Sequence, residues 1–293
     1  MQSNSIRKKE RKIIFLFLFF PILLLITFGF LPVIYLFQYS LTSWNGLSDI
    51  KEFVGFDNFF KIITNPSYVK VFLNSLYYFA SGVLQIIISL YFAILLSTKI
   101  KGKSFFKAII FFPTLISGVA ISMMFRMFFS PGGTFDEILI LLGLKEYIKF
   151  WLGDPVFVNY TLASISLWRY TGFSFIMYFG AIATIPNEYK KVAKLEGATF
   201  LQQVRYVILP NIHTVIKVNF ILLTIGAISV FEIPMILTNG SNGTMTFLLQ
   251  TMKTAFEKKM FGMAASMAVI LSIVVGVLIM LQKIVYRNDE DEF

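Results

Sequence analysis

Three charged residues stand out within long apolar stretches of the chain: Arg126, Arg169 and Glu232. An ionised side chain at the centre of a membrane helix costs roughly 2.5–3.5 kcal/mol on insertion scales, so such residues indicate function by default. The Arg169 guanidinium and the Glu232 carboxylate can form strong charge-assisted hydrogen bonds. Four aromatic side chains accompany them: Trp168, Tyr170, Phe173 and Phe231. Planar polar groups beside flat apolar rings can bind a sugar, so we predict that these six residues line a path for one.

Each of these residues also has a structural interpretation. Arg126 lies near the end of its stretch and can extend toward the membrane surface, which we favour over a role in the path. The four aromatic residues can be ordinary packing between helices. Arg169 can pair with Glu232 and simply hold two helices together. These alternatives stay open at the level of the sequence.

The residue types argue against catalysis by this chain. It has no cysteine, which excludes disulfides and thiolate metal sites, and its single histidine, His213, cannot form a histidine cluster. No Gly-x-x-x-x-Gly-Lys-Ser/Thr loop is present to cradle phosphates, so the chain is not expected to bind ATP. We predict a non-enzymatic chain with no cofactor or metal of its own.

Composition indicates that these residues lie in a bilayer. The 293 residues are 57% hydrophobic and 14% charged, whereas soluble domains are about 25% charged. The net charge of +10 is better explained by orientation than by nucleic acid, because Lys and Arg collect on the cytoplasmic side of membrane proteins. The expected surroundings are therefore membrane lipid, and no nucleic-acid partner is predicted.

Six segments are long and apolar enough to cross a hydrocarbon core of about 30 Å, which needs about 20 residues. They lie at about 13–37, 73–97, 105–129, 160–184, 212–237 and 262–286. Together they predict an all-α integral membrane domain over 13–286, between a basic tail at 1–12 and an acidic tail at 287–293. The first segment is too long for the apolar part of a cleaved signal peptide, and Pro21 and Pro32 should bend it.

The connections between these segments set the orientation. Basic residues collect in the amino-terminal tail, in the second connection (Lys99, Lys101, Lys103, Lys107) and in the fourth (Lys190, Lys191, Lys194, Arg205). The first and third connections are poorer in them, and the fifth is the least clear. This bias predicts that both termini and the second and fourth connections lie in the cytoplasm.

The fourth connection, residues 186–210, reads as a helix, a break and a second helix. Pro186 suits a helix start, residues 187–196 form a short helix, and Gly197 suits its left-handed end. The following run to Pro210 is amphipathic. A solvated connector is the plain alternative. A short helix offered to the cytoplasm instead favours docking into the groove of a partner protein.

The run IPNEYKKVAKLEGATFLQQVRYVILP resembles the signature loop of ABC-importer permeases: Glu-Ala-Ala, three residues, Gly, nine residues, then Ile-x-Leu-Pro. Residues at the matching spacing are Ala193, Gly197, Val207, Leu209 and Pro210. The resemblance implies a coupling helix that fits a cleft on an ATPase subunit. The contact residues it implies are Glu188, Lys191, Ala193, Lys194, Glu196, Gly197, Ala198 and Pro210. Lys191 and Val192 stand where the family usually has Glu and Ala, so the ionic partner of Lys191 should differ.

Further stretches resemble permeases of the first carbohydrate-uptake class, the maltose and glycerol-phosphate type. The third connection, GGTFDEILILLGLKEYIKFWLGDP, looks like the hairpin that these permeases carry before the fourth span. Trp168 and Gly172 match a Trp-rich patch, and VFEIPMILTNGSNGTMT matches a Phe-Asp…Thr-Gly-Gly-Gly-Pro element, with Phe231 and Glu232 at Phe-Asp. Ser241-Asn242-Gly243 replaces its Gly-Gly-Pro.

This resemblance implies the type I ABC importer permease fold in a bacterial cytoplasmic membrane. It further implies a second permease subunit, two ATPase subunits that use ATP and Mg, an extracellular solute-binding protein, and a sugar substrate, expected to be an oligosaccharide. The alternative substrate is a non-sugar solute such as a glycerophosphodiester or a polyol. A membrane enzyme or a stand-alone secondary transporter is disfavoured, because the sequence shows no symmetric pair of broken spans and no chain of acids or histidines for protons.

Overall fold

The computed structural model of the chain describes residues 2–98 and 100–288. Within those ranges the regular secondary structure is helical, with one isolated β-bridge between Thr42 and Phe53, so the all-α prediction is confirmed. Lys99 and most of the predicted acidic tail at 287–293 lie outside the described residues. No side chain is described in the predicted basic tail at 1–12.

The helices belong to two compact units. The first is built from residues up to Asn65 together with Thr251–Ser272, and the second from Pro66–Gln250 together with residues from Ile273 on. The predicted single domain over 13–286 thus divides into two units by its contacts, and the candidate site lies wholly within the second.

The first unit opens with a long helical stretch. It consists of α1 (Gln2–Leu24), a π-helical turn η1 (Leu25–Phe30) and α2 (Leu31–Ser40). Pro21 lies inside α1 without ending it, whereas η1 ends directly before Leu31–Pro32. A proline ring clashes with the carbonyl four residues back, here that of Phe28, and the wider π turn leaves room for it.

Three hydrogen bonds and one close backbone approach hold the end of α2 within this unit. The buried Asn58 amide, on α3 (Asp57–Thr64), donates to the Ser40 carbonyl at 3.1 Å and to the Thr42 carbonyl at 2.8 Å. Ser266 Oγ donates to the Ser40 carbonyl at 2.7 Å. A side chain at Gly262 would collide with the Thr42 carbonyl. These bonds satisfy carbonyls that the helix end leaves free.

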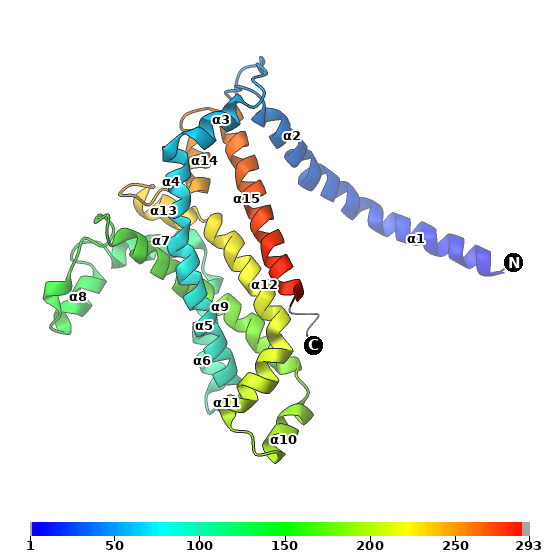
Figure 1. The fold of residues 1–293 in the computed structure, drawn as a ribbon, viewed down its shortest axis with the longest axis vertical. Helices are drawn as coiled ribbons and strands as arrows, with labels where there is room; N and C mark the ends of the chain where they lie inside the picture. Colours follow the sequence, from blue (N-terminus) through cyan, green and yellow to red (C-terminus); the bar gives the residue numbers. More distant parts are fainter. Residues whose placement is uncertain (1, 99, 289–293) are drawn as a thin grey trace. The chain divides into compact units, whose positions relative to one another are not determined.

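The second unit is a bundle around one long central helix, α9 (Val158–Thr184), which packs against α5 (Ser75–Ser97), α6 (Lys103–Leu115) and α12 (Leu209–Ile228) (Figure 1). Its remaining elements are α4 (Pro66–Leu73), α7 (Gly118–Phe128), α8 (Thr134–Leu141), η2 (Lys145–Tyr147), α10 (Asn187–Leu195), α11 (Phe200–Gln203), η3 (Val204–Ile208) and α13 (Glu232–Thr238). Helices α14 (Phe247–Phe256) and α15 (Phe261–Asn288) each begin in one unit and end in the other.

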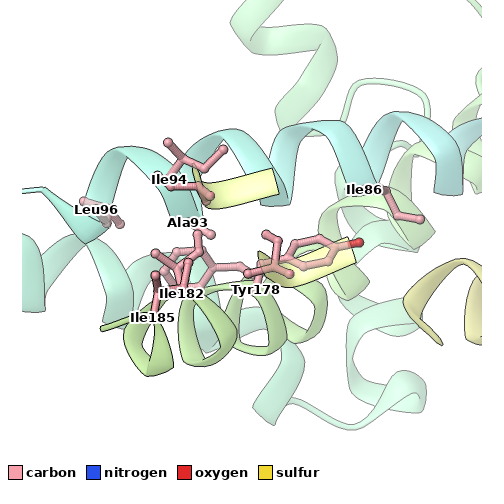
Figure 2. Close-up of a cluster of buried hydrophobic side chains, with 10 residues drawn as sticks. Ile86, Ala93, Ile94, Leu96, Tyr178, Ile182 and Ile185 are labelled. Carbon is pink, nitrogen blue, oxygen red and sulfur yellow. The ribbon is translucent and has the colours of Figure 1, made fainter. Parts of the chain in front are cut away.

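An apolar core lies between α5 and α9. Figure 2 shows Ala93 of α5 facing Tyr178 and Ile182 of α9, and Ile86 and Ile94 of α5 belong to the same buried cluster. Since lipid is as apolar as these side chains, close van der Waals packing rather than escape from water must stabilise this contact in a membrane.

Within the described residues, four helical stretches are long and apolar enough to cross a membrane: Ile13–Ser40, Pro66–Ser97, Phe200–Thr238 and Phe261–Tyr286. The bent pair of α6 and α7 makes a fifth if it counts as one span. The predicted span at 160–184 corresponds to α9, which has 27 residues but too polar a composition to count among them. Its buried polar residues, such as Asn159, Thr161, Ser166 and Ser174, lie inside the bundle, where protein groups rather than lipid surround them.

Two of the predicted spans are not the continuous helices that their composition indicates. The segment at 105–129 turns by 99° between α6 and α7, where Ile116 and Ser117 are extended and Ser117 Oγ caps α7. The segment at 212–237 is interrupted between α12 and α13. There Pro234 has no N–H for the Val230 carbonyl, and the Thr246 hydroxyl donates to that carbonyl instead at 2.6 Å.

Tyr178 provides a test of the core. Its side chain is fully buried, and its hydroxyl has no hydrogen-bond partner among the described residues. Tyr178→Phe keeps the packing and removes an unsatisfied hydroxyl, so it should leave the thermal unfolding temperature of the assembled protein unchanged or raise it. Tyr178→Ala leaves a cavity and should cost about 3–5 kcal/mol. A large loss of stability in Tyr178→Phe would show that the hydroxyl has a partner and contradict this packing.

Candidate functional site

A cavity of about 430 Å³ opens between helices of the second unit. Its walls come from α5, α9 and α12 and from the interrupted segment that leads into α13. This volume lies within the range of about 300–1,000 Å³ that small-molecule sites occupy. Its lining combines apolar side chains with hydroxyl, amide and ionised groups, which is the mixture that a polar solute with an apolar face requires.

The ion pair at the cavity joins Arg169 of α9 to Glu232 of α13. Arg169 Nη1 donates to Glu232 Oε2 at 2.7 Å, and the two side chains are 16% and 32% exposed. Glu232 lies in the first turn of α13, where the partial positive charge of a helix start stabilises a carboxylate. The Arg169 guanidinium also lies 5.1 Å from the centre of the Tyr170 ring. Each charge therefore has an opposite charge beside it and a second favourable neighbour.

Gly118, the first residue of α7, lies directly against this pair. A Cβ at this position would overlap the Glu232 carboxylate and Arg169 Nη1. The bend between α6 and α7 and the interruption between α12 and α13 thus meet at one ion pair. Only a residue without a side chain lets the backbone of α7 come this close.

A buried polar network forms another part of the wall. Gln85 of α5 donates to Ser174 Oγ at 2.5 Å and to the Tyr170 carbonyl at 3.0 Å. Asn219 of α12 donates to the same Ser174 Oγ at 2.9 Å. The network links three helices around the cavity, and sequence reasoning missed it. The signal was present, since Gln85 and Asn219 are amides within apolar spans.

The structure places five of the six predicted path residues on the cavity wall: Arg169, Tyr170, Phe173, Phe231 and Glu232. Trp168 does not line it. Its ring packs edge-on against Phe125 of α7, with 5.3 Å between ring centres, which matches the packing interpretation. Arg126 is exposed in the last turn of α7, away from the residues that line the cavity.

Lys217 is a further charged residue within a predicted span, and no role for it was predicted from the sequence. On α12, its Nζ donates to the Tyr286 carbonyl at 3.0 Å and lies 5.4 Å from the centre of the Tyr286 ring. It occupies a helix-end carbonyl, as basic residues near helix C-termini commonly do. Lys217 therefore ties the end of α15 to α12, outside the cavity.

The predicted coupling loop, residues 186–210, has the expected two-helix form. Helix α10 ends at Leu195, one residue earlier than predicted, and Gly197 takes the left-handed conformation with φ +80°. Thr199 and Gln202 then form a capping box that starts α11. The π turn η3 precedes Leu209–Pro210, as η1 precedes Leu31–Pro32. Local sequence therefore determines this loop.

The coupling loop presents apolar side chains to its surroundings. Leu195 is 88% exposed, and Tyr189, Val192 and Leu201 are exposed as well. Of the predicted contact residues, Glu188, Lys191, Lys194, Glu196, Gly197 and Pro210 are exposed, while Ala193 and Ala198 are partly covered. An apolar row with charges of both signs around it is a surface suited to a protein partner.

Metal chemistry has no support in the described part of the chain. Across residues 2–98 and 100–288, no three His, Cys, Asp or Glu side chains gather in a way that could hold a metal ion. The cavity contains one carboxylate, already paired, and its other polar groups are hydroxyls, amides and one guanidinium. Such groups bind and orient a solute.

Comparison with known families gives one match, to the family described as "Binding-protein-dependent transport system inner membrane component", over residues 85–288. The match runs from the polar network at Gln85 through the ion pair and the coupling loop to the end of α15. It thus includes most of the cavity wall described above.

Curated relatives are similar along most of their length. The probable ABC transporter permease protein YurN of Bacillus subtilis is 29% identical over 289 residues, covering 97% of this chain and 99% of that protein. The multiple sugar-binding transport system permease protein MsmF of Streptococcus mutans is 29% identical over 269 residues, covering 91% and 92%. The diacetylchitobiose uptake system permease protein NgcF of Streptomyces coelicolor is 27% identical over 291 residues, covering 92% and 82%.

A solved structure shares the fold. A bacterial ABC transporter involved in the import of the acidic polysaccharide alginate has a chain that matches with a TM-score of 0.83 and 20% identity, covering 96% of both chains. The same kind of transporter, in complex with an alginate pentasaccharide-bound periplasmic protein, matches with a TM-score of 0.82 and 20% identity, covering 94% of this chain and 93% of that chain.

The contact at Gly118 makes a steric prediction. Gly118→Ala forces the ion pair apart, so it should lower the amount of assembled protein and its thermal stability by on the order of 1–3 kcal/mol. Gly180→Ala is the matched control, because this α9 glycine has open space around it and alanine favours the helix. The yield and unfolding temperature of the purified proteins measure both changes.

A second substitution separates the ion pair from general crowding. If the damage in Gly118→Ala comes from the displaced pair, then Glu232→Ala added to Gly118→Ala should cost much less than Glu232→Ala alone, because contacting residues are not additive. Full additivity of the two changes would show that Gly118 and the pair act independently.

Proposed function

Because the chain belongs to the family of binding-protein-dependent transport system inner membrane components, we propose that it is the membrane-spanning permease subunit of an ABC importer for an oligosaccharide. It forms half of the translocation path beside a second permease subunit. Two ATPase subunits bind on the cytoplasmic side and use ATP and Mg, and an extracellular solute-binding protein delivers the sugar. The coupling loop, with its Gly197 turn and exposed apolar row, is the observation that carries this proposal.

The proposed topology has six spans with both termini in the cytoplasm. Helix α9 is too polar to be identified as a span from its composition alone. Its place at the centre of the second unit supports its assignment as the fourth span. A helix enclosed by α5, α6 and α12 faces protein on most sides, so it can carry polar residues that lipid would not tolerate. The bent pair of α6 and α7 then counts as the third span.

Docking of the coupling loop onto an ATPase is supported by its chemistry. Tyr189, Val192 and Leu195 are exposed along α10 at spacings of three residues, so they share one side of the helix. Glu188, Lys191, Lys194 and Glu196 surround them with both charge signs. The loop thus offers an apolar anchor and a charged rim, which is the form of helix-in-groove recognition. Lys191 requires an acidic partner in that groove.

A sugar substrate is supported by two independent features. Relatives along the whole chain are named for multiple sugars and for diacetylchitobiose. The cavity places the exposed rings of Tyr170 and Phe173 near the amides of Gln85 and Asn219. Aromatic faces can cover the apolar face of a pyranose ring, and amides and hydroxyls can bond its hydroxyl groups. A polyol or a glycerophosphodiester is the alternative, since one relative is named for osmoprotective compounds.

Cross-linking tests the ATPase contact. The chain has no native cysteine, so Lys194→Cys or Ala198→Cys creates a single thiol. Each should cross-link to the co-purified ATPase and be protected from a bulky thiol reagent in the full complex, whereas Ser241→Cys, in the outer connection, should do neither. Thiols at Lys194→Cys and Ala198→Cys that remain fully accessible in the complex would refute the docking assignment.

The chain purified alone should show no ATP hydrolysis.

Gly197→Asp tests coupling itself. Gly197 and Gly143 both have left-handed backbone, φ +80° and +73°, with open space around the missing side chain. Asp should therefore impose similar backbone strain, on the order of 1 kcal/mol, at either position. Only Gly197→Asp adds a charge to the proposed interface, so it should lower sugar-stimulated ATP hydrolysis by tenfold or more, on the order of 1.4 kcal/mol. Gly143→Asp should transport normally, and equal losses in both variants would favour strain over docking.

A further inference from the structure

We propose that the path through this chain is electroneutral and accepts neutral saccharides while excluding uronates and phosphorylated solutes. This inference rests on the proposed function and defines its substrate class. It follows from the charges on the cavity wall, from the way they are paired, and from the uncharged polar groups on the rest of the wall.

The charge content of the wall is small. Among the described residues that line the cavity, only Arg169 and Glu232 carry a charge at neutral pH. Their direct contact at 2.7 Å places the positive and negative charges almost at the same point. Seen from a solute a few ångströms away, such a pair acts as a dipole, and its field falls off faster with distance than that of a single charge.

The pairing decides what the arginine can do. A free guanidinium in a partly enclosed cavity would attract a carboxylate or phosphate strongly, since it presents a planar fork of donors. Here Nη1 is already bonded to Glu232, and the guanidinium lies against the Tyr170 ring. An anionic solute that approached the remaining donors of Arg169 would meet the repulsion of the Glu232 carboxylate beside them, and displacing that carboxylate would leave Glu232 as an unpaired charge, which is strongly unfavourable in a desolvated site.

The rest of the wall suits hydroxyl groups. Ser81, Ser229 and Thr114 contribute hydroxyls, and Gln85 and Asn219 contribute amides. Ser81 and Thr114 donate to the Tyr78 and Arg169 carbonyls, and their oxygens can still accept hydrogen bonds from the hydroxyls of a neutral saccharide. The alginate transporter shares the fold at 20% identity and imports an acidic polysaccharide. The shared fold therefore does not fix the charge of the solute, and the charged residues on the wall must set it.

A single thiol in the wall can report the electrostatic potential there. Ser229 lines the cavity and lies three residues before Glu232 in the sequence. Ser229→Cys therefore places the only cysteine of this chain on the cavity wall. The complete transporter in nanodiscs is then treated with two methanethiosulfonates of similar size, the anionic sulfonatoethyl and the cationic trimethylammonioethyl reagent. The labelling rate of this subunit is measured for each reagent by intact mass and divided by the rate at which that reagent labels a free thiol in solution. The corrected ratio is the resulting anionic rate divided by the cationic rate.

Four backgrounds, of which two share one expected ratio, test the inference. With the native pair, the corrected ratio of anionic to cationic labelling should stay within about threefold of one. Glu232→Gln leaves Arg169 unpaired and should raise the ratio by about tenfold or more, whereas Arg169→Gln should lower it by a similar factor. The double variant Arg169→Gln with Glu232→Gln should return to the native ratio. Because it carries no charge, it provides the comparison even if one single variant assembles poorly.

The outcomes separate two kinds of failure. A native ratio that favours the anionic reagent by tenfold or more would overturn the neutral-substrate inference while leaving the transport function intact. An unchanged ratio in both single variants would overturn it as well, because the pair would then not set the potential. No labelling by either reagent in any background would instead show that the cavity lies outside the water-filled path, and the proposed function of this site would fail.

Discussion

The ion pair between Arg169 and Glu232 is the contact on which the second unit depends. Either charge alone would be costly so far inside an apolar bundle, and each is made tolerable by the other at 2.7 Å. The pair also fixes chain geometry, because it joins α9 to the start of α13 and leaves room only for the glycine that starts α7. Two helix breaks far apart in sequence are thereby held at one place, and the cavity lies beside them.

Helix breaks in a bilayer require that every freed backbone group finds a partner in the protein. This chain uses a hydroxyl in each case. Ser117 Oγ accepts the Ala120 amide where α7 begins, and the Thr246 hydroxyl donates to the Val230 carbonyl where Pro234 cannot. The wide turns before Pro32 and Pro210 solve the related problem of fitting a proline ring into a continuing helix. The irregular backbone is thus specified by small polar residues and prolines.

What the sequence predicts well is what local residues decide. The coupling loop was predicted to within one residue at the end of α10, because Gly197, Thr199 and Pro210 act on their immediate neighbours. The breaks at Ile116–Ser117 and Ser229–Phe231 were not predicted. Gly118 and Pro234 lie close after them, but the Thr246 hydroxyl that bonds the Val230 carbonyl and the ion pair against Gly118 come from distant parts of the chain, which local sequence does not show. Trp168 shows the same limit: its residue type suits a sugar, but the position of Phe125 decides that it packs outside the cavity.

Two long helices connect the coupling loop with the ion pair at the cavity. Helix α9 carries Arg169 and runs directly into Pro186, and α12 runs from the coupling loop to the break before Glu232. The 16 residues from Arg169 to Thr184 span about 22 Å at a rise of 1.5 Å for each step, and the 20 residues of α12 span about 30 Å. The coupling loop is therefore the connection between the helices that lead to the two members of the ion pair. In the proposed transporter, a displacement of the loop would act on Arg169 through α9 and, through α12, on the break before Glu232.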